Sequence, residues 1–234
     1  MDVFSYLLGK SKGGVQPTGT INITENGTYD VTNYASAEVE VQSGIILPDG
    51  YTLVNYLESS GTQYIDTDYI PNTNTKIELK CLVLDTGGIV FGNRQPAEGG
   101  GDDIYYALGP ASGKMTFFYN QRLRESSTID TGNFVNFIVE NDHVSFNAVD
   151  YNININIFPT DYSIILFGLN NAGVLSLSSV RIGRIKISEN DTLVHDYIPC
   201  FRNSDSIAGM YDLVDETFLT NNGTGSFTYP PNYL

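Results

Sequence analysis

From residue 51 onward, apolar and polar residues alternate in many short stretches. In residues 134–140 every second residue is apolar, which is the pattern of a strand with one buried face. Turn-forming residues separate these stretches, as Asn141 and Asp142 do at the end of this one. No segment has a long helical periodicity. Many short strands with frequent turns predict an all-β protein, either a sandwich or a jelly roll.

The expected strands share this alternation or a short apolar run. They lie near residues 52–57, 63–66, 75–84, 88–92, 103–108, 114–119, 134–140, 143–149, 162–168, 180–187, 193–199, 208–213 and 216–219. Gly183 predicts a bulge, and Asn190 with Asp191 predicts a tight turn. Asp215 and Glu216 predict the turn of a final hairpin. Its inner residues are expected to be Met210, Leu213, Val214 and Phe218. We expect the first and last segments of this domain to pair.

The first ten residues, MDVFSYLLGK, are a feature of their own. Val3, Phe4, Leu7 and Leu8 would lie on one face of a short helix. A helix of this length is not stable alone in water, so we expect these four residues to anchor the chain to a partner or to other copies. Glycines and a proline follow, and residues 1–17 are therefore expected to be an anchor peptide with its linker.

Residues 18–44 predict a small β unit. Alternating apolar positions flank Asn26 and Gly27, a strong signal for a type I′ hairpin turn. So few strands cannot form an independent core, and the unit is expected to pack on the main domain or on neighbouring copies. Residues 45–234 are long enough for one sandwich with a sizeable core.

The charge of the chain excludes two kinds of partner. Twelve Lys and Arg against 27 Asp and Glu give a formal net charge of −15. Binding to nucleic acid or to anionic lipid needs a surface rich in Lys and Arg, so neither is expected. The chain opens without a secretory signal, and its longest apolar run is too short to span a bilayer. We therefore expect synthesis in a cytoplasm and no membrane insertion.

Cys81 and Cys200 are the two cysteines of the chain. Two cysteines do not make a disulfide framework, and both lie in strand-like runs. Buried free thiols are the expectation, with a single bridge between them as the alternative.

Three stretches resemble proteins of one group. TINITENGTYDVTNYASAEVEV resembles a short β motif of tail-associated and other structural proteins in phages and prophages of Gram-positive gut bacteria. LPDGYTLVNYLESSGTQYIDTDYIPNTNTKIEL resembles the start of the concanavalin A-like (laminin-G-like) domain of the same proteins. IGRIKISENDTLVHDYIPCFRNSDSIAGMYDLVDETFLTNNGTGSF resembles the end of that domain.

This resemblance implies a concanavalin A-like jelly-roll sandwich over residues 45–234. It also implies a non-catalytic virion structural protein, such as a head decoration, a fibre or a tail-associated adhesin, bound to other virion proteins of the capsid or tail. Such a protein would be located in the virion after assembly in the bacterial cytoplasm. We expect a homo-oligomer, with a trimer as the first expectation. The alternative is a lectin that recognises a glycan on the host surface, and a polysaccharide depolymerase is the less favoured reading.

Carboxylate pairs were sought because sandwiches of this shape can be glycosidases. Glycoside hydrolysis needs two carboxylates about 5–10 Å apart, and alternate residues on a strand are about 6.5–7 Å apart. The nearest pairs are Glu38 with Glu40, outside the main domain, and Asp66 with Asp68, in a stretch that belongs to the resemblance. We expect neither pair to be catalytic and the chain not to be an enzyme.

The two histidines, His143 and His195, give no catalytic or zinc motif. His195 precedes Asp196, but neighbours on a strand face opposite ways, and no nucleophile accompanies them. The spacing of His and Cys residues is not that of a zinc site. No cofactor is therefore expected, although calcium stays open because it needs only oxygen ligands from loops. Candidate calcium ligands are Asp102, Asp103, Asn190 and Asp191.

Carbohydrate binding is the remaining hypothesis for a site. Sugars stack on aromatic rings and form hydrogen bonds with Asn, Asp and Arg side chains. The candidate residues are Asn93, Arg94, Tyr105, Tyr106 and Tyr119, together with Phe118. Because side chains alternate along a strand, at least half of these residues are expected in the core.

Overall fold

The structure is a computed structural model. It describes residues 45–85, 87–96, 103–120, 123–130, 132–140, 143–153 and 160–230. Leu47–Asn232 form one compact unit. The expected anchor residues Val3, Phe4, Leu7 and Leu8 and the expected β unit at 18–44 lie outside the described residues. Among the described residues there is no helix that is long and apolar enough to cross a membrane.

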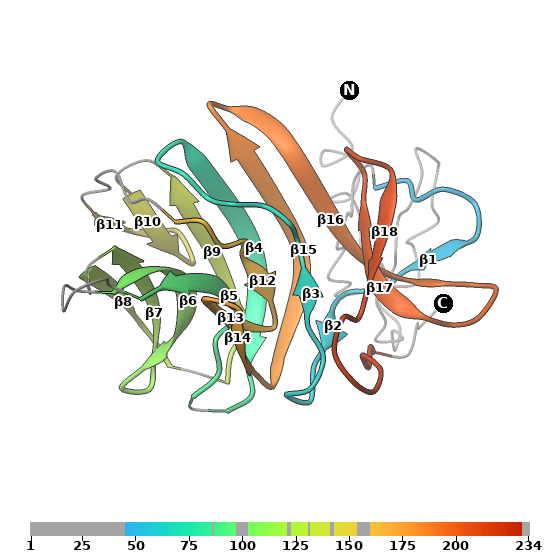
Figure 1. The fold of residues 1–234 in the computed structure, drawn as a ribbon, viewed down its shortest axis with the longest axis horizontal. Coiled ribbons are helices and arrows are strands. Elements are labelled where there is room, and N and C mark those ends of the chain that lie inside the picture. The colour runs from blue at the N-terminus through green and yellow to red at the C-terminus, as the bar shows by residue number, and fades with distance from the viewer. Residues whose placement is uncertain are drawn as a thin grey trace, which may run out of the picture. The chain divides into compact units, whose positions relative to one another are not determined.

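Strands are the only regular elements of the described residues, which confirms the all-β prediction (Figure 1). Ten strands form the first sheet, which we call sheet A. Its order is β11 (Val149–Asn152), β10 (His143–Phe146), β9 (Val135–Glu140), β4 (Thr75–Val83), β15 (Val180–Glu189), β16 (Thr192–Arg202), β17 (Ala208–Asp212) and β18 (Thr217–Thr220). Two short strands complete it, β1 (Tyr51–Leu53) beside β16 and β2 (Leu57–Glu58) beside β15.

Eight strands form the second sheet, sheet B. Its order is β14 (Val174–Leu177), β13 (Gly168–Asn171), β5 (Phe91–Gln95), β6 (Ile104–Ala111), β7 (Lys114–Asn120) and β8 (Leu123–Asp130). β12 (Ile165–Leu166) pairs with both β5 and β3 (Ile65–Asp66). β13 pairs with β5 in parallel, whereas the other strand pairs of the described residues are antiparallel.

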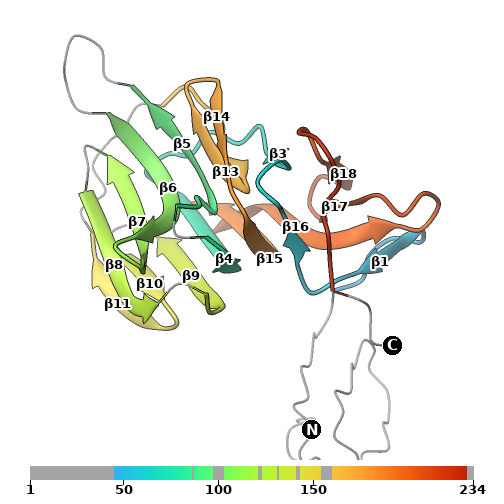
Figure 2. The same cartoon turned by 90° about the horizontal axis from the view of Figure 1, so that it is seen from below.

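The two sheets pack face to face as a β-sandwich, as the views in Figures 1 and 2 show. Phe137 of β9 lies between the sheets, with its ring centroid 6.1 Å from that of Phe91 and 5.5 Å from that of Phe117. All three rings are buried. Burying large apolar side chains from both sheets removes their surface from water, which is the main stabilising term of such a core.

Strand β15 has the inner face that its sequence predicts. Ile182, Ile185 and Ile187 are buried, and the pairing of β15 with β4 shifts register between Ile182 and Ile185. Gly183 lies in this bulge, where a Cβ atom would be 3.3 Å from the carbonyl oxygen of Asn55. Both the burial and the bulge are therefore confirmed.

The first and last segments of the domain lie side by side, as expected. β1 pairs with β16, and Glu58 forms an isolated antiparallel bridge with Thr228. The backbone N–H of Asn222 donates to the carbonyl of Tyr64 over 2.9 Å. The sandwich is thus closed by residues far apart in the sequence.

Two predicted hairpins are present, with one correction. Asn190 and Asp191 both have positive φ, 47° and 63°, as a type I′ turn between β15 and β16 requires. β17 and β18 form the last hairpin, and Met210 on it is buried. Val214 was expected on its inner side, but it is 41% exposed. It lies in the loop between the paired residues Asp212 and Thr217, where strand alternation no longer directs the side chain inward.

Four strands were missed in the sequence, namely β8, β11, β13 and β14. One strand was predicted over 162–168, but β12 ends at Leu166 and Phe167 has a φ of 68°. The chain turns there and continues as β13. The two-residue strand β12 is defined by its pairing with β3 and β5 rather than by local alternation, so the pattern alone could not place its end. β11 ends at Asn152, and residues 154–159 lie outside the described residues.

Both cysteines are buried free thiols, Cys81 on β4 and Cys200 on β16. Burial raises the pKa of each thiol to about 12. The prediction of buried free cysteines is therefore confirmed, and the alternative of a bridge between them is wrong.

A substitution of Gly209 on β17 tests how tightly the last hairpin packs. A Cβ atom at this position would lie 2.2 Å from the carbonyl oxygen of Leu219. We expect Gly209→Ala to lower the free energy of unfolding by about 1–3 kcal/mol, because the added methyl group overpacks the sheet. Urea denaturation followed by tyrosine fluorescence measures this change.

The matched control is Gly87→Ala, since Gly87 is exposed and its nearest atom would be 3.9 Å away. Equal stability of the two variants would contradict the packing described for β17 and β18.

Candidate functional site

The residues of the predicted glycan site lie on β5, β6 and β7, but on opposite faces of sheet B. The three that point into the core, each at most 1% exposed, are Asn93, Tyr106 and Tyr119. The three that are half-buried on the outer face are Arg94, Tyr105 and Phe118. This division follows the alternation of side chains along each strand. A surface site on this sheet can therefore include only the outer three, which we call the outer strip.

The outer strip joins a cation to two aromatic rings. The Arg94 guanidinium lies 5.3 Å from the centroid of the Tyr105 ring, and the Tyr105 and Phe118 ring centroids are 6.4 Å apart. Arg94 also forms an ion pair with Asp103, in which Nε donates to Oδ2 over 3.1 Å. Rings with adjacent charged hydrogen-bonding groups can bind a sugar, because its C–H face packs on an aromatic ring and its hydroxyls bind charged groups.

The inner residues have a structural role. The Asn93 side chain donates from Nδ2 to the carbonyl of Tyr162 over 2.6 Å. Asn170, on the neighbouring strand β13, donates in the same way to the carbonyl of Ser163. These bonds hold the segment before β12 against sheet B. Burial raises the pKa of the Tyr106 hydroxyl well above its usual value, so that this phenol stays protonated.

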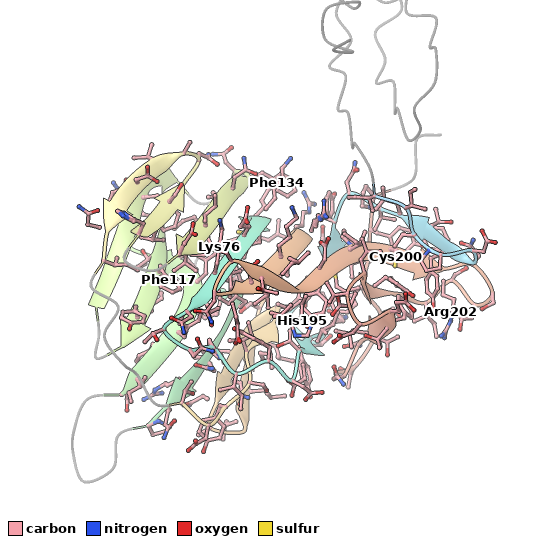
Figure 3. All side chains as sticks on the ribbon, turned by 90° about the horizontal axis from the view of Figure 1, so that it is seen from above. Lys76, Phe117, Phe134, His195, Cys200 and Arg202 are labelled. Atoms are coloured by element: carbon pink, nitrogen blue, oxygen red, sulfur yellow. The ribbon has the colours of Figure 1, made fainter. Side chains whose placement is uncertain are left out.

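A second polar cluster lies on the inner face of sheet A, where β16 and β17 pair. His195 on β16 and Asp212 on β17 are joined by a 2.7 Å hydrogen bond between Nδ1 and Oδ2. Asp215, in the loop after β17, brings its Oδ2 to 3.5 Å from the same nitrogen. In Figure 3, His195 lies between the part of the sheet that carries Lys76 and the end that carries Cys200 and Arg202.

Aromatic rings fix the orientation of His195. Its ring stacks on that of Tyr197, with centroids 5.2 Å apart and an angle of 9° between the planes. Tyr69 meets the His195 ring edge-on at 5.7 Å. The Tyr69 hydroxyl in turn donates to Glu189 over 2.8 Å. These contacts leave the imidazole ring of His195 few possible orientations.

Asp212 is the most constrained member of the cluster. Its Oδ1 accepts the backbone N–H of Asp196 over 3.0 Å and that of Val214 over 2.9 Å. Burial of this carboxyl acts to raise its pKa, but the hydrogen bonds from His195 and the two backbone groups outweigh burial and lower it. The hydrogen bond to Asp212 raises the pKa of His195, against the opposing effect of burial. The pair therefore favours an ionised aspartate beside the imidazole.

The aspartate that follows His195 in the sequence is not its partner. Asp196 faces the opposite side of β16, as alternation predicts, and binds Arg184 through Nε over 2.7 Å. The partner of His195 is Asp212, seventeen residues away. The register of β16 with β17 sets Asp212 opposite Tyr197, and the sequence predicted both of these strands but not their register. Without that register, the sequence could not show which carboxylates surround His195.

The carboxylates considered for catalysis have other roles where they are described. Asp66 accepts at Oδ1 from the Ser163 hydroxyl over 2.7 Å and from the backbone N–H of Asp68 over 3.1 Å. Asp68 is exposed and has a φ of 55°. These are the contacts of a turn. Glu38 and Glu40 lie outside the described residues.

The described candidates for calcium ligands have other roles. Asp103 pairs with Arg94, Asp102 lies outside the described residues, and Asn190 and Asp191 form the turn between β15 and β16. These two turn residues line a surface depression of about 180 Å³ with Asn74, Lys76 and Glu140. Lys76 neutralises negative charge in this depression, because its ammonium lies 3.0 Å from the Glu140 carboxylate.

No model of a known protein family matches this chain, and no curated protein sequence matches it. We therefore infer what each cluster can do from its geometry. His195 can bind a proton or a metal ion, but among the described residues no hydroxyl or thiol nucleophile forms a hydrogen bond with it. The outer strip can bind an uncharged polar ligand that has an apolar face.

Asp212 and Asp215 should differ in their effect on stability. We expect Asp212→Ala to lower the free energy of unfolding by about 3 kcal/mol, because two backbone donors and His195 lose a charged acceptor. Asp215→Ala should change it by less than about 0.5 kcal/mol, since this carboxylate is mostly exposed. Urea denaturation at pH 7 in the presence of EDTA measures both values. If the two variants lose equal stability, the Asp212 carboxylate does not hold this hairpin.

Proposed function

We propose that this chain is a non-catalytic structural protein of a bacteriophage virion. In this proposal residues 45–234 form a concanavalin A-like jelly-roll sandwich that is displayed on the particle as a decoration, a fibre or a tail-associated adhesin. The observation that carries this proposal is that three described acidic side chains form contacts that stabilise the fold. Asp66 holds a turn, Asp196 pairs with Arg184, and Asp212 holds a hairpin. Contacts of this kind stabilise the fold, which supports a structural role for the sandwich.

The strand order supports the jelly-roll assignment. β4 lies between β9 and β15, and β5 lies between β6 and β13. Strands that neighbour each other in the sheets therefore come from distant parts of the chain, as the crossovers of a jelly roll require. The contact of the first and last segments, at Glu58 and Thr228, agrees with the resemblance of residues 47–79 and 182–227 to the two ends of such a domain.

The residues before the sandwich supply the attachment in this proposal. Val3, Phe4, Leu7 and Leu8 bind another virion protein of the head or tail, and residues 11–17 act as a linker. The exposed sandwich then projects from the particle. A homo-oligomer, with a trimer as the first expectation, would multiply weak anchoring contacts through avidity.

Attachment can be tested with particles of the encoding phage that lack this chain. We expect added wild-type protein to co-sediment with them. Leu7→Asp combined with Leu8→Asp should reduce the bound fraction at least tenfold, because two charges replace the apolar contact. The measurement is the amount of chain in the particle band of a density gradient.

Ser11→Asp combined with Gln16→Asp is the control, since it adds the same charge to the linker and should leave binding unchanged. Both variants should unfold at the wild-type temperature. No co-sedimentation of the wild-type chain, or equal binding of both double variants, would contradict the proposal.

A glycan-binding lectin is the second candidate, and the outer strip favours it. Arg94, Tyr105 and Phe118 place a cation and two half-buried rings together on one face of sheet B. In this alternative the sandwich recognises a polysaccharide of the host surface.

A glycan array probed with the full chain tests this alternative. If a glycan binds, we expect Tyr105→Ala to weaken binding at least tenfold, because the central ring of the outer strip is lost. Tyr64→Ala is the matched control and should bind as the wild type does, since Tyr64 lies outside the outer strip. Absence of wild-type binding would contradict the lectin and leave the structural role.

A further inference from the structure

Three groups that commonly bind metal ions converge where β17 ends. One ligand atom each from His195, Asp212 and Asp215 lies within 4.8 Å of the other two. Nδ1 of His195 is 2.7 Å from Oδ2 of Asp212 and 3.5 Å from Oδ2 of Asp215. We propose that these three residues form a binding site for a divalent transition-metal ion, for which Zn²⁺ is the probe.

Neighbouring groups hold the ligands in place before an ion binds. Tyr197 and Tyr69 orient the imidazole by stacking and by an edge contact. The backbone N–H groups of Asp196 and Val214 occupy Oδ1 of Asp212, so that its Oδ2 faces His195. Supporting contacts of this kind orient the ligands of metal sites. Asp215, whose side chain is 56% exposed, leaves one side open for an ion to enter.

Tyr197 packs beside the ligands on the same face of β16 as His195. It is 1% exposed, and its ring stacks on the imidazole of His195. It lies opposite Asp212 in the pairing of β16 with β17. The stacked ring therefore shields one side of the imidazole from water.

The surrounding charge favours a cation. Glu189 adds a carboxylate near the cluster, since it accepts the hydroxyl of Tyr69 over 2.8 Å and the Tyr69 ring meets that of His195. A neutral imidazole with two ionised aspartates carries two negative charges, which a divalent ion neutralises. Calcium prefers oxygen ligands alone, whereas imidazole with carboxylates suits zinc and similar transition metals.

The distances fit a tetrahedral ion after one change. Two ligand atoms that are each about 2.0–2.1 Å from zinc in a tetrahedral site lie about 3.3 Å apart. The distance from His195 to Asp215 already has this length, and the shorter distance to Asp212 is that of a hydrogen bond. Binding therefore requires that the Nδ1 proton leave to solvent while Nε2 carries the remaining proton of the neutral ring. The ion then takes the place of the Nδ1 proton between the imidazole and the two carboxylates.

Isothermal titration of the full chain, first stripped with EDTA, tests the site with Zn²⁺. We expect one ion per chain and a rise in the unfolding temperature when zinc is added. Asp215→Asn should weaken zinc binding at least tenfold while it leaves the unfolding temperature of the metal-free chain unchanged. His143→Gln removes the other histidine, on β10, and should bind zinc as the wild type does.

Cobalt provides a second readout. Co²⁺ bound to the wild-type chain should absorb visible light as tetrahedral cobalt does, and His195→Gln should lose this spectrum. Failure of the wild type to bind zinc would overturn the proposal. So would zinc binding that Asp215→Asn leaves unchanged, or that His143→Gln abolishes.

Discussion

Phe137 packs against Phe91 and Phe117 at the centre of the molecule, and the rest of the structure depends on this contact between the two sheets. Each sheet must turn one face toward these rings, and the pleat then decides the environment of every other side chain on the same strands. On β15 this requirement buries Ile185 and Ile187. On β16, which pairs with β15, it directs Tyr197 and His195 to the same side, because they lie opposite these isoleucines. The polar cluster on β16 and β17 is thus a continuation of the apolar face.

The pleat also explains how the aromatic residues of sheet B are used. Tyr106 and Tyr119 are committed to the core, whereas Tyr105 and Phe118, one position away in each strand, are half-buried on the outer face. A single strand therefore supports the fold with one side and offers a binding surface with the other. By contrast, the described carboxylates mostly stabilise the scaffold, because they accept hydrogen bonds in turns and hairpins or form ion pairs.

Local alternation was sufficient to predict β9 and β15, the bulge at Gly183, and the turn at Asn190 and Asp191. It failed for β13 and β14, a short hairpin whose leucine and valine residues are not its buried positions and in which only β13 pairs with a distant strand, β5. The outer strip was named in the sequence as part of a larger set, and only the observed register separated its members from the core. The contact of His195 with Asp212 could not be predicted, since it depends on how β17 aligns with β16. The sequence shows which side chains the protein has, whereas the register of the strands determines which of them are in contact.

The pairing of the first segment with the last has a consequence for the order of events during synthesis. Glu58 forms its bridge with Thr228, so this pair cannot form until residue 228 has left the ribosome. Contacts between residues so far apart in sequence slow folding, because a long loop must close before they contribute. β1 and β2 likewise have no strand partner until β16 and β15 have been made. The sandwich is therefore most exposed to misassembly during synthesis, and becomes resistant once its first and last segments have paired.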